Sequence, residues 1–411
     1  MAEYKKRNVK KQNKRIKNAI NNDIKMTPAK KIKSKSHTEA KPQKSAKPSS
    51  QPTHKKIRVI KGGKKNFKRL RLLLIGILIC LIGGIVLSSC LLPTGLYDYL
   101  QNMSAISGSG SGFPQALSGG NISNILSSQK YFLIASDTNV VGYNIKGKNI
   151  FSYQHGYEIP VIKSSKTRFL IYSQGSVDFG IYNYKKNLKT AQTANPILAA
   201  AVSDSGYYAL ATQSDSYASQ LTVYNNKHEQ VYQWFCSDYI INDVILSDNG
   251  KSVAVSVFNA QNGFFNSRIY ILGYSSATPE KIIEYNNDLI TALKSYNNKG
   301  FFAIFENKAE HISWHNFSAQ SYTFENNVIF ARGTEKYSLI ATCREANIGD
   351  NTVYVFDNKG SKLTSFDFEN EIRNITVKGK YIYILGDRKI FLYSVGGELL
   401  NETDCDFGVE H

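Results

Sequence analysis

The feature that most constrains the fold is a repeat of about 42 residues that runs through the last 290 or so residues of the chain. Small polar turns, clearest at residues 203–206 and 247–250, lead into short strands rich in aromatic and β-branched residues. These strands begin at Tyr131, Phe169, Tyr207, Ser252, Phe301, Tyr337 and Tyr381. Their mean spacing matches the roughly 40 to 50 residues of a four-stranded propeller blade.

A second series of turns alternates with the first and follows strands that usually end in an aromatic residue. It occupies residues 143–147, 182–186, 224–228, 274–276, 314–316, 356–360 and 393–397. Asn and Gly suit these turns because both tolerate positive φ. Each repeat therefore predicts four strands, and seven repeats closing radially leave no long exposed sheet edge.

We therefore predict an all-β fold, a seven-bladed β-propeller over residues 121–411. Its blades are expected to start near Asn121, Glu158, Pro196, Tyr239, Asp288, Asn327 and Glu371. Six or eight blades remain open as alternatives. The closure of the ring also stays open, since either residues 121–126 or a preceding segment could pair with the last blade.

Ahead of the repeats, residues 72–92 form a run of 21 residues without a charge, 14 of which are Leu, Ile or Val. As a helix, this run would extend about 32 Å at roughly 1.5 Å per residue, enough for a hydrocarbon core of about 30 Å. The sequence predicts a single transmembrane helix here.

Residues 1–71 contain 25 Lys and Arg and three acidic residues, so the formal charge of +19 belongs to this arm. The arm has few aromatic residues and is expected to be disordered. The positive-inside rule places the N-terminus in the cytoplasm and the C-terminal domain outside the cell membrane. We expect the arm to attract anionic inner-leaflet lipids, and nucleic acid is not expected as a partner because the aromatics of a base-reading module are missing.

Residues 93–120 are predicted to be a Gly/Ser-rich spacer, flexible at residues 107–112. Just before it, residues 87–90 (Leu-Ser-Ser-Cys) resemble a lipobox, so lipidation of Cys90 is a less favoured alternative to the uncleaved helix. A buried free thiol is the expected state of Cys236 and Cys343, and a disulfide between two of Cys236, Cys343 and Cys405 stays open as an alternative.

The chain combines a basic arm, a single span, a spacer ending in Gly112-Phe113-Pro114 and Tyr-Asn-x-x-Gly turns. In this combination it resembles an uncharacterised family of membrane-anchored β-propellers from clostridia-type Gram-positive bacteria. The resemblance covers residues 58–411, including the stretch 160–175, and implies WD40-like or quinoprotein-like repeats and an envelope location. It implies no catalytic residue. A quinone cofactor is not expected, since the repeat Trp is absent and Trp234 and Trp314 are the only two.

Two groups of residues are candidates for metal sites. Asp204 and Asp248 lie in Ser-Asp-x-Gly turns, where an Asp commonly accepts a hydrogen bond from a backbone amide two residues on. His311 and His315 would lie about 13 Å apart in an extended strand and could share a metal only across a bulge or turn at Ser313. We expect neither a metal nor another cofactor.

No Gly-x-Ser-x-Gly elbow, His-Glu-x-x-His motif or phosphate-binding loop is present. The leading hypothesis is therefore a non-enzymatic binding platform for a protein or wall polymer. Its contact residues are expected among loop aromatics and their neighbours: Asn262, Phe264 and Phe265, then Tyr157 and Tyr217. The alternative is a propeller hydrolase or lyase acting on wall glycans, which paired carboxylates about 5 to 10 Å apart would favour.

Overall fold

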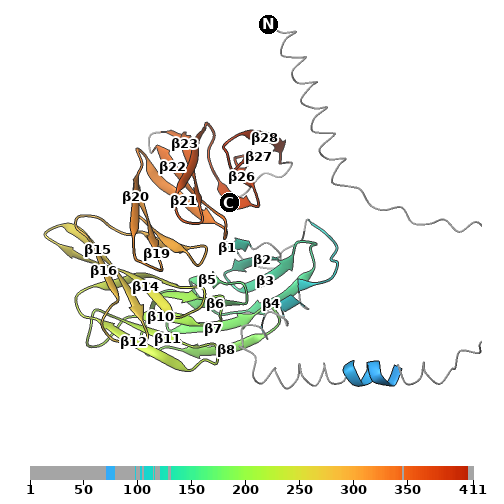
Figure 1. Ribbon diagram of the computed structural model, residues 1–411, viewed down its shortest axis with the longest axis horizontal. Helices are drawn as coiled ribbons and strands as arrows, with labels where there is room; N and C mark the ends of the chain where they lie inside the picture. The colour runs from blue at the N-terminus through green and yellow to red at the C-terminus, as the bar shows by residue number, and fades with distance from the viewer. Residues whose placement is uncertain are drawn as a thin grey trace, which may run out of the picture. The chain divides into compact units, whose positions relative to one another are not determined.

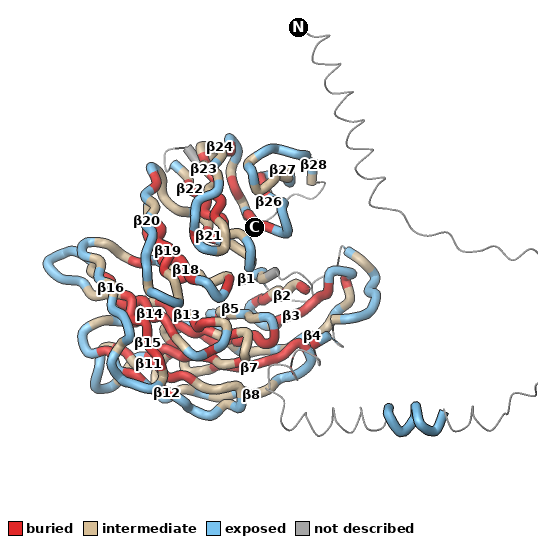
Figure 2. The backbone as a smooth tube through the Cα atoms, viewed as in Figure 1, coloured by how far each residue is buried: buried red, intermediate tan, exposed pale blue. Residues whose placement is uncertain are grey.

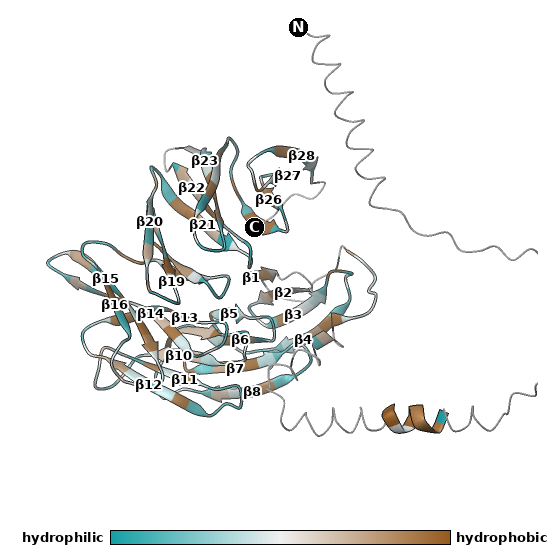
Figure 3. Ribbon diagram, in the orientation of Figure 1, coloured by the Kyte–Doolittle hydropathy of each residue, from teal (hydrophilic) through white to brown (hydrophobic). Residues whose placement is uncertain are grey.

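The computed structural model describes residues 71–78, 98, 102–103, 106–113, 115, 121–127, 131–344 and 347–405. The predicted basic arm lies outside the described residues except for Arg71. Residues 71–78 are helical and mostly apolar (Figure 3), whereas the rest of the predicted span, residues 79–92, lies outside the described part. No helix in the described ranges is long and apolar enough to cross a membrane. The chain divides at Leu72 into two compact units, and the second contains the propeller.

The propeller consists of seven sheets, each made of four consecutive antiparallel strands (Figure 1). Blade 1 comprises β1 (Ile122–Ser127), β2 (Tyr131–Ser136), β3 (Asn139–Asn144) and β4 (Asn149–Gln154). Blade 2 comprises β5 (Pro160–Ser164), β6 (Arg168–Ser173), β7 (Asp178–Asn183) and β8 (Asn187–Gln192). Blade 3 comprises β9 (Ile197–Val202), β10 (Tyr208–Thr212), β11 (Ser219–Tyr224) and β12 (Gln230–Cys236).

The remaining four blades follow the same order. Blade 4 comprises β13 (Ile240–Leu246), β14 (Ser252–Gln261), β15 (Phe264–Gly273) and β16 (Lys281–Tyr285). Blade 5 comprises β17 (Ala292–Ser295), β18 (Gly300–Ile304), β19 (Lys308–Ser313) and β20 (Ala319–Thr323). Blade 6 comprises β21 (Asn327–Gly333), β22 (Tyr337–Arg344), β23 (Asn347–Asp357) and β24 (Lys362–Phe368). Blade 7 comprises β25 (Asn374–Lys378), β26 (Tyr381–Leu385), β27 (Lys389–Ser394) and β28 (Leu399–Asp404).

The prediction of an all-β, seven-bladed propeller is confirmed, and each blade begins within four residues of its expected start. Of the two closures left open, residues 121–126 do not join the last blade, because β1 pairs with β2 inside blade 1. Within the described ranges, no sheet combines strands from the two ends of the chain. The described part of the ring is therefore not closed by a sheet shared between the first and last blades.

The core lies between neighbouring sheets, where the second and third strands are mostly buried and the fourth strands are mostly exposed (Figure 2). Between blades 1 and 2 it is aromatic: the Phe169 ring lies 5.1 Å from both Phe151 of β4 and Tyr182 of β7. Phe169 is completely buried. Burial of one such side chain stabilises the fold by about 1.5 to 3 kcal/mol.

The strand order assigns every connection to one of two faces. In an antiparallel meander, the turns between first and second strands and between third and fourth strands lie at one end of the sheet, which we call the turn face. The connections between second and third strands and between blades lie at the other end, the loop face. A hydrogen bond between two turns supports this grouping: the Ser205 amide of blade 3 donates to the Asp248 carbonyl of blade 4 at 3.1 Å.

Candidate functional site

The longest hairpin of blade 4 extends beyond the rest of its sheet on the loop face. Strands β14 and β15 each have 10 residues and remain paired to the tip, where Gln261 faces Phe264. Asn262 and Gly263 form the two-residue turn with φ of +52° and +81°, the left-handed geometry that Asn-Gly adopts at little cost. Residues 259–266, here called the finger, project from the left side of the molecule in Figure 1.

Two adjacent phenylalanines are held open to solvent at this tip. Phe264 is 58% exposed and Phe265 is 47% exposed. Phe265 has one aromatic neighbour in the hairpin, Phe258, with ring centroids 6.0 Å apart in an edge contact. The finger extends past the neighbouring strands β13 and β16, which leaves both rings accessible to another molecule. Exposed aromatics on a rigid hairpin are typical of binding contacts.

The other two predicted contact residues lie on the same face but in different blades. Tyr217, between β10 and β11, is 45% exposed and lies 4.8 Å from the ring of Phe235. Tyr157, between blades 1 and 2, is half-buried and stacks on His155 at 5.2 Å; burial, with Tyr182, raises the pKa of its hydroxyl. The fold thus places all five predicted residues on the loop face. Their role in binding stays a prediction.

Charged side chains on the first strands of several blades lie close together, and the sequence repeats did not predict this. Lys163 of β5 pairs with Asp243 of β13 at 3.2 Å, and the Leu293 amide of β17 donates to the same carboxylate at 3.0 Å. Burial lowers the pKa of the neighbouring Lys294, and the charges of Lys163 and Arg332 act in the same direction. Asp243 is thus occupied as an acceptor and does not form a pair of carboxylates for acid–base chemistry.

A group of carboxylates does lie on the turn face. The Lys166 ammonium is 2.6 Å from Asp204 of blade 3 and 2.6 Å from Glu335 of blade 6, so these two oxygens are no farther apart than twice that distance. Nearby, burial raises the pKa of Asp248; the charges of Asp204 and Glu335 act in the same direction, and that of Lys166 opposes them. Carboxyl groups held close together are one requirement for glycoside cleavage, which uses two of them about 5 to 10 Å apart.

The expected role of Asp204 was wrong in one respect. Its carboxylate does not bond to its own turn but accepts from the Lys166 backbone amide of blade 2 at 2.9 Å. The adjacent Ser203 hydroxyl oxygen instead accepts from the Tyr207 amide of that turn at 3.1 Å. The physical reason is that Lys166 offers both an amide and an ammonium across the gap between blades, whereas the Asp204 turn already has an acceptor.

The two histidines considered for a metal site, His311 and His315, lie in different environments. His311 of β19 is buried with its ring 5.0 Å from Phe302, and burial lowers its pKa. His315 lies in the turn that follows, where its amide donates to Ser313. Across the residues that the structure describes, no three His, Cys, Asp or Glu side chains are grouped so that they could hold a metal ion. Cys236 is a buried thiol, as expected, whereas Cys343 is only half-buried because it lies near the end of its strand; Cys236, Cys343 and Cys405 form no disulfide.

Sequence reasoning missed a buried ion pair between the predicted spacer and blade 2. The Arg168 Nε donates to an Asp98 carboxylate oxygen at 2.6 Å, and each side chain is only 4% exposed. Asn183 donates to the other oxygen of Asp98 at 3.3 Å. The available signal was the pairing of Asp98, the first charge after the apolar run, with Asn102 four residues later, on the same side of a helical turn.

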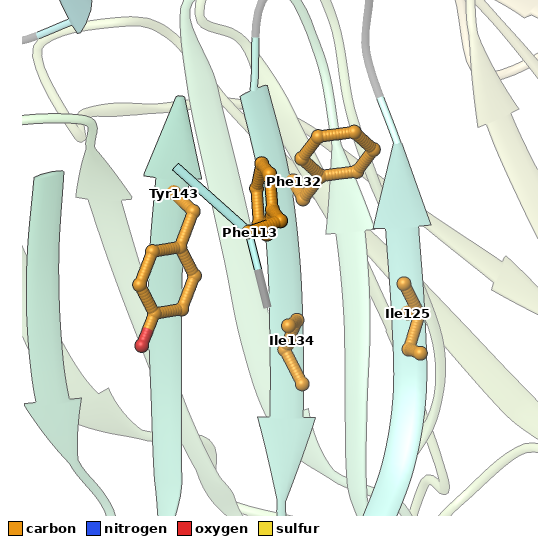
Figure 4. Close-up of a pocket in the computed structure, with 5 residues that line it drawn as sticks. All are labelled: Phe113, Ile125, Phe132, Ile134 and Tyr143. Carbon is orange, nitrogen blue, oxygen red and sulfur yellow. The ribbon is translucent and has the colours of Figure 1, made fainter. Parts of the chain in front are cut away.

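The same segment also helps to form an apolar pocket on blade 1 (Figure 4). Phe113 lies over Phe132 with ring centroids 5.9 Å apart, and over Tyr143 at 6.4 Å. Ile125 and Ile134 complete the lining of a pocket of about 240 Å³. None of these five lining residues is charged, so the pocket offers a ligand mainly hydrophobic contact.

Several solved β-propellers resemble this chain in fold. BamB from Moraxella catarrhalis is 12% identical with a TM-score of 0.47, over 69% of this chain and 88% of that one. Apo AztD from Citrobacter koseri is 13% identical with a TM-score of 0.49, over 69% and 86%. The Cps50 (Swd1) β-propeller domain of Myceliophteria thermophila is 11% identical with a TM-score of 0.49, over 66% and 96%.

No curated protein matches the chain significantly. A family model does match, and it spans residues 116–411, which include all seven blades. The matched region coincides with the part of the chain in which the four-stranded sheets repeat. The chain belongs to a family of unknown function, DUF5711, whose matched region is the propeller.

Proposed function

We propose that this protein is a binding platform of the cell envelope. In this proposal residues 72–92 span the cell membrane once, the basic arm lies in the cytoplasm near anionic lipids, and the propeller lies outside. The loop face recruits a protein or a wall polymer, with the finger as its principal contact.

The observation that carries the proposal is the pair of exposed rings, Phe264 and Phe265, on a fully paired hairpin. Leaving apolar rings in water is unfavourable, and burial by a partner would return about 25 cal/mol per Å² of covered area. A hairpin that is already ordered loses little conformational entropy on binding, so more of that energy contributes to affinity. Aromatic side chains are also enriched among the residues that dominate binding energy.

The test is recovery of envelope components with the full chain and two variants. We expect the wild-type chain to retain a reproducible protein or purified wall polymer, and Phe264→Ser/Phe265→Ser to lose it. The matched control is Tyr381→Ser on β26, because Tyr381 is also 47% exposed but lies in blade 7. Equal recovery by the finger variant and wild type would contradict the proposal.

A second candidate function, hydrolysis or cleavage of wall glycans, is favoured by the carboxylates at Lys166. If Asp248 is a general acid, Asp248→Asn should abolish product release from purified peptidoglycan while leaving the fold intact. The finger variant should then release product at the wild-type rate. Absence of any product release by the wild-type chain would remove this candidate and leave the platform unaffected.

A further inference from the structure

The described residues of the segment 98–113, here called the stalk, make their polar contacts with one face of the propeller. Asn102 donates to the Thr167 carbonyl at 2.7 Å and accepts from the Tyr184 amide at 3.0 Å. Thr167 lies in the turn between β5 and β6, and Tyr184 in the turn between β7 and β8. Both turns belong to the turn face, so the stalk lies against the side opposite the finger.

The ion pair of the stalk also reaches blade 3. Besides Asp98, the Arg168 guanidinium donates to the carbonyls of Gly206 at 3.2 Å and Asn226 at 2.9 Å. These two carbonyls belong to turn-face turns of blade 3. They are neutral acceptors, so Asp98 is the carboxylate in direct contact with this buried cation. Detaching the stalk would leave the charge of Arg168 uncompensated in the interior, which strongly opposes detachment.

Blade 1 holds the other end of the stalk. The Asn144 side chain donates to the carbonyls of Ile106 at 2.9 Å and Gly108 at 3.0 Å. The Gly112 amide donates to the Lys146 carbonyl at 3.2 Å. An added Cβ at Gly110 would lie 2.1 Å from the Lys148 backbone nitrogen, so the backbones approach as closely as only glycine allows. The glycines predicted as a flexible centre thus allow close packing here.

We infer that the stalk is a latch that holds the propeller in one orientation, with the turn face toward the membrane and the finger directed away from it. The inference rests on the proposed function for the presence of the membrane anchor, but the latch itself rests on the contacts of residues 98–113. It also specifies the partner. A surface directed away from the bilayer fits an extracytoplasmic or wall-associated macromolecule, and not a lipid surface or a membrane-embedded domain.

The latch can be tested without a membrane partner by chymotrypsin digestion of the full chain in detergent. Met103 of the stalk is a cleavage site, and the sequence offers two more, Tyr99 and Leu100, in the same stretch of chain. We expect Asp98→Ala and Asn102→Ala to be cleaved there about tenfold faster than wild type, because a detached segment is cut without local unfolding. Asn102→Ala leaves no buried charge unpaired, so it reports on the latch even if Asp98→Ala fails to fold.

The matched control is Asp357→Ala. Asp357 accepts from the Lys359 and Ser361 amides in a turn-face turn of blade 6 and makes these contacts away from the stalk. Its cleavage at the stalk should remain at the wild-type rate. Rapid cleavage of the wild-type stalk, or cleavage of Asn102→Ala no faster than the control, would overturn the latch.

Orientation is tested by energy transfer in vesicles of phosphatidylcholine and phosphatidylglycerol that contain acceptor-labelled lipid. The five native cysteines are replaced, and the donor dye is placed at Lys227→Cys on the turn face or Phe264→Cys on the finger. We expect stronger transfer from position 227, and loss of the difference with Asn102→Ala. Equal or reversed transfer would overturn the orientation. A chain that fails to enter vesicles contradicts the proposed anchor, while the digestion still decides the latch.

Discussion

Arg168 is a single buried charge that connects several parts of the structure. It joins the stalk to blades 2 and 3 through a carboxylate and two carbonyls, all within 3.2 Å. His228, in a nearby turn, experiences the same charge. Burial lowers its pKa to about 4, with contributions from the positive charges of Arg168 and Lys189. We therefore expect substitutions that affect Arg168 or His228 to change the free energy of unfolding.

At this scale, Asp98→Ala should lower the free energy of unfolding by about 3 to 5 kcal/mol, because it leaves a buried cation without its partner. Denaturant unfolding of the full chain measures this change. Asp357→Ala, which removes turn hydrogen bonds at an exposed position, should cost only about 1 kcal/mol. Similar losses for the two variants would show that the Asp98–Arg168 pair contributes no more than an ordinary polar contact.

His228 should make stability depend on pH in a defined window. Its pKa is about 4 in the folded protein and about 6.5 when exposed, so the unfolded chain binds the proton first as the pH falls. Stability should therefore decrease between pH 6.5 and 4. His228→Asn should weaken this dependence, and it keeps the turn because Asn tolerates the left-handed φ of +69° at this position. An unchanged pH profile would contradict this assignment.

At the scale of single elements, the hairpin β14–β15 and the packing between blades have separate roles. The finger lies beyond the blade cores and carries exposed rings, whereas the stack around Phe169 is buried between two sheets. Changes in the finger should therefore affect binding, and changes in the stack should affect folding.

Gly263→Val should distort the finger, because a β-branched residue is strained at φ of +81°. We expect reduced recovery of the partner with a thermal midpoint close to that of wild type. The comparison variant, Phe169→Ala, should lower the free energy of unfolding by about 3 to 5 kcal/mol through the cavity it creates. A large drop in thermal stability for Gly263→Val would show that the finger is part of the folding core.

At the scale of the whole molecule, each sheet is completed by four strands that follow one another in sequence. Long-range contacts such as Lys166 with Glu335 of blade 6 then connect blades that lie far apart in the chain. Because Lys166 and Glu335 are both exposed, their contribution to stability is expected to be below about 1 kcal/mol. Packing between neighbouring sheets, not this bridge, therefore provides most of the stability of the ring.

The proposed topology can be tested in intact cells with a chain that contains a single cysteine at Lys227→Cys. If the propeller lies outside the membrane, a membrane-impermeant maleimide should label this position before lysis. The control is a single cysteine at Lys30→Cys in the basic arm, which should be labelled only after lysis. Labelling of position 30 but not 227 in intact cells would contradict the topology.

The amino-acid sequence by itself predicted seven blades and placed their starts to within four residues, while the structure excluded the open alternatives of six or eight. Turn chemistry and the alternation of apolar residues are local, so each repeat contains the information for its own strands. Residues 261–265 were expected to be a loop, and this was wrong: the strands continue to the Asn262–Gly263 turn, and Phe264 and Phe265 belong to β15. The tertiary structure alone decided which distant residues meet. Asp98 and Arg168 are 70 residues apart, and no periodicity links them. Their pairing exists because the fold brings the stalk against turns whose buried cation requires a carboxylate.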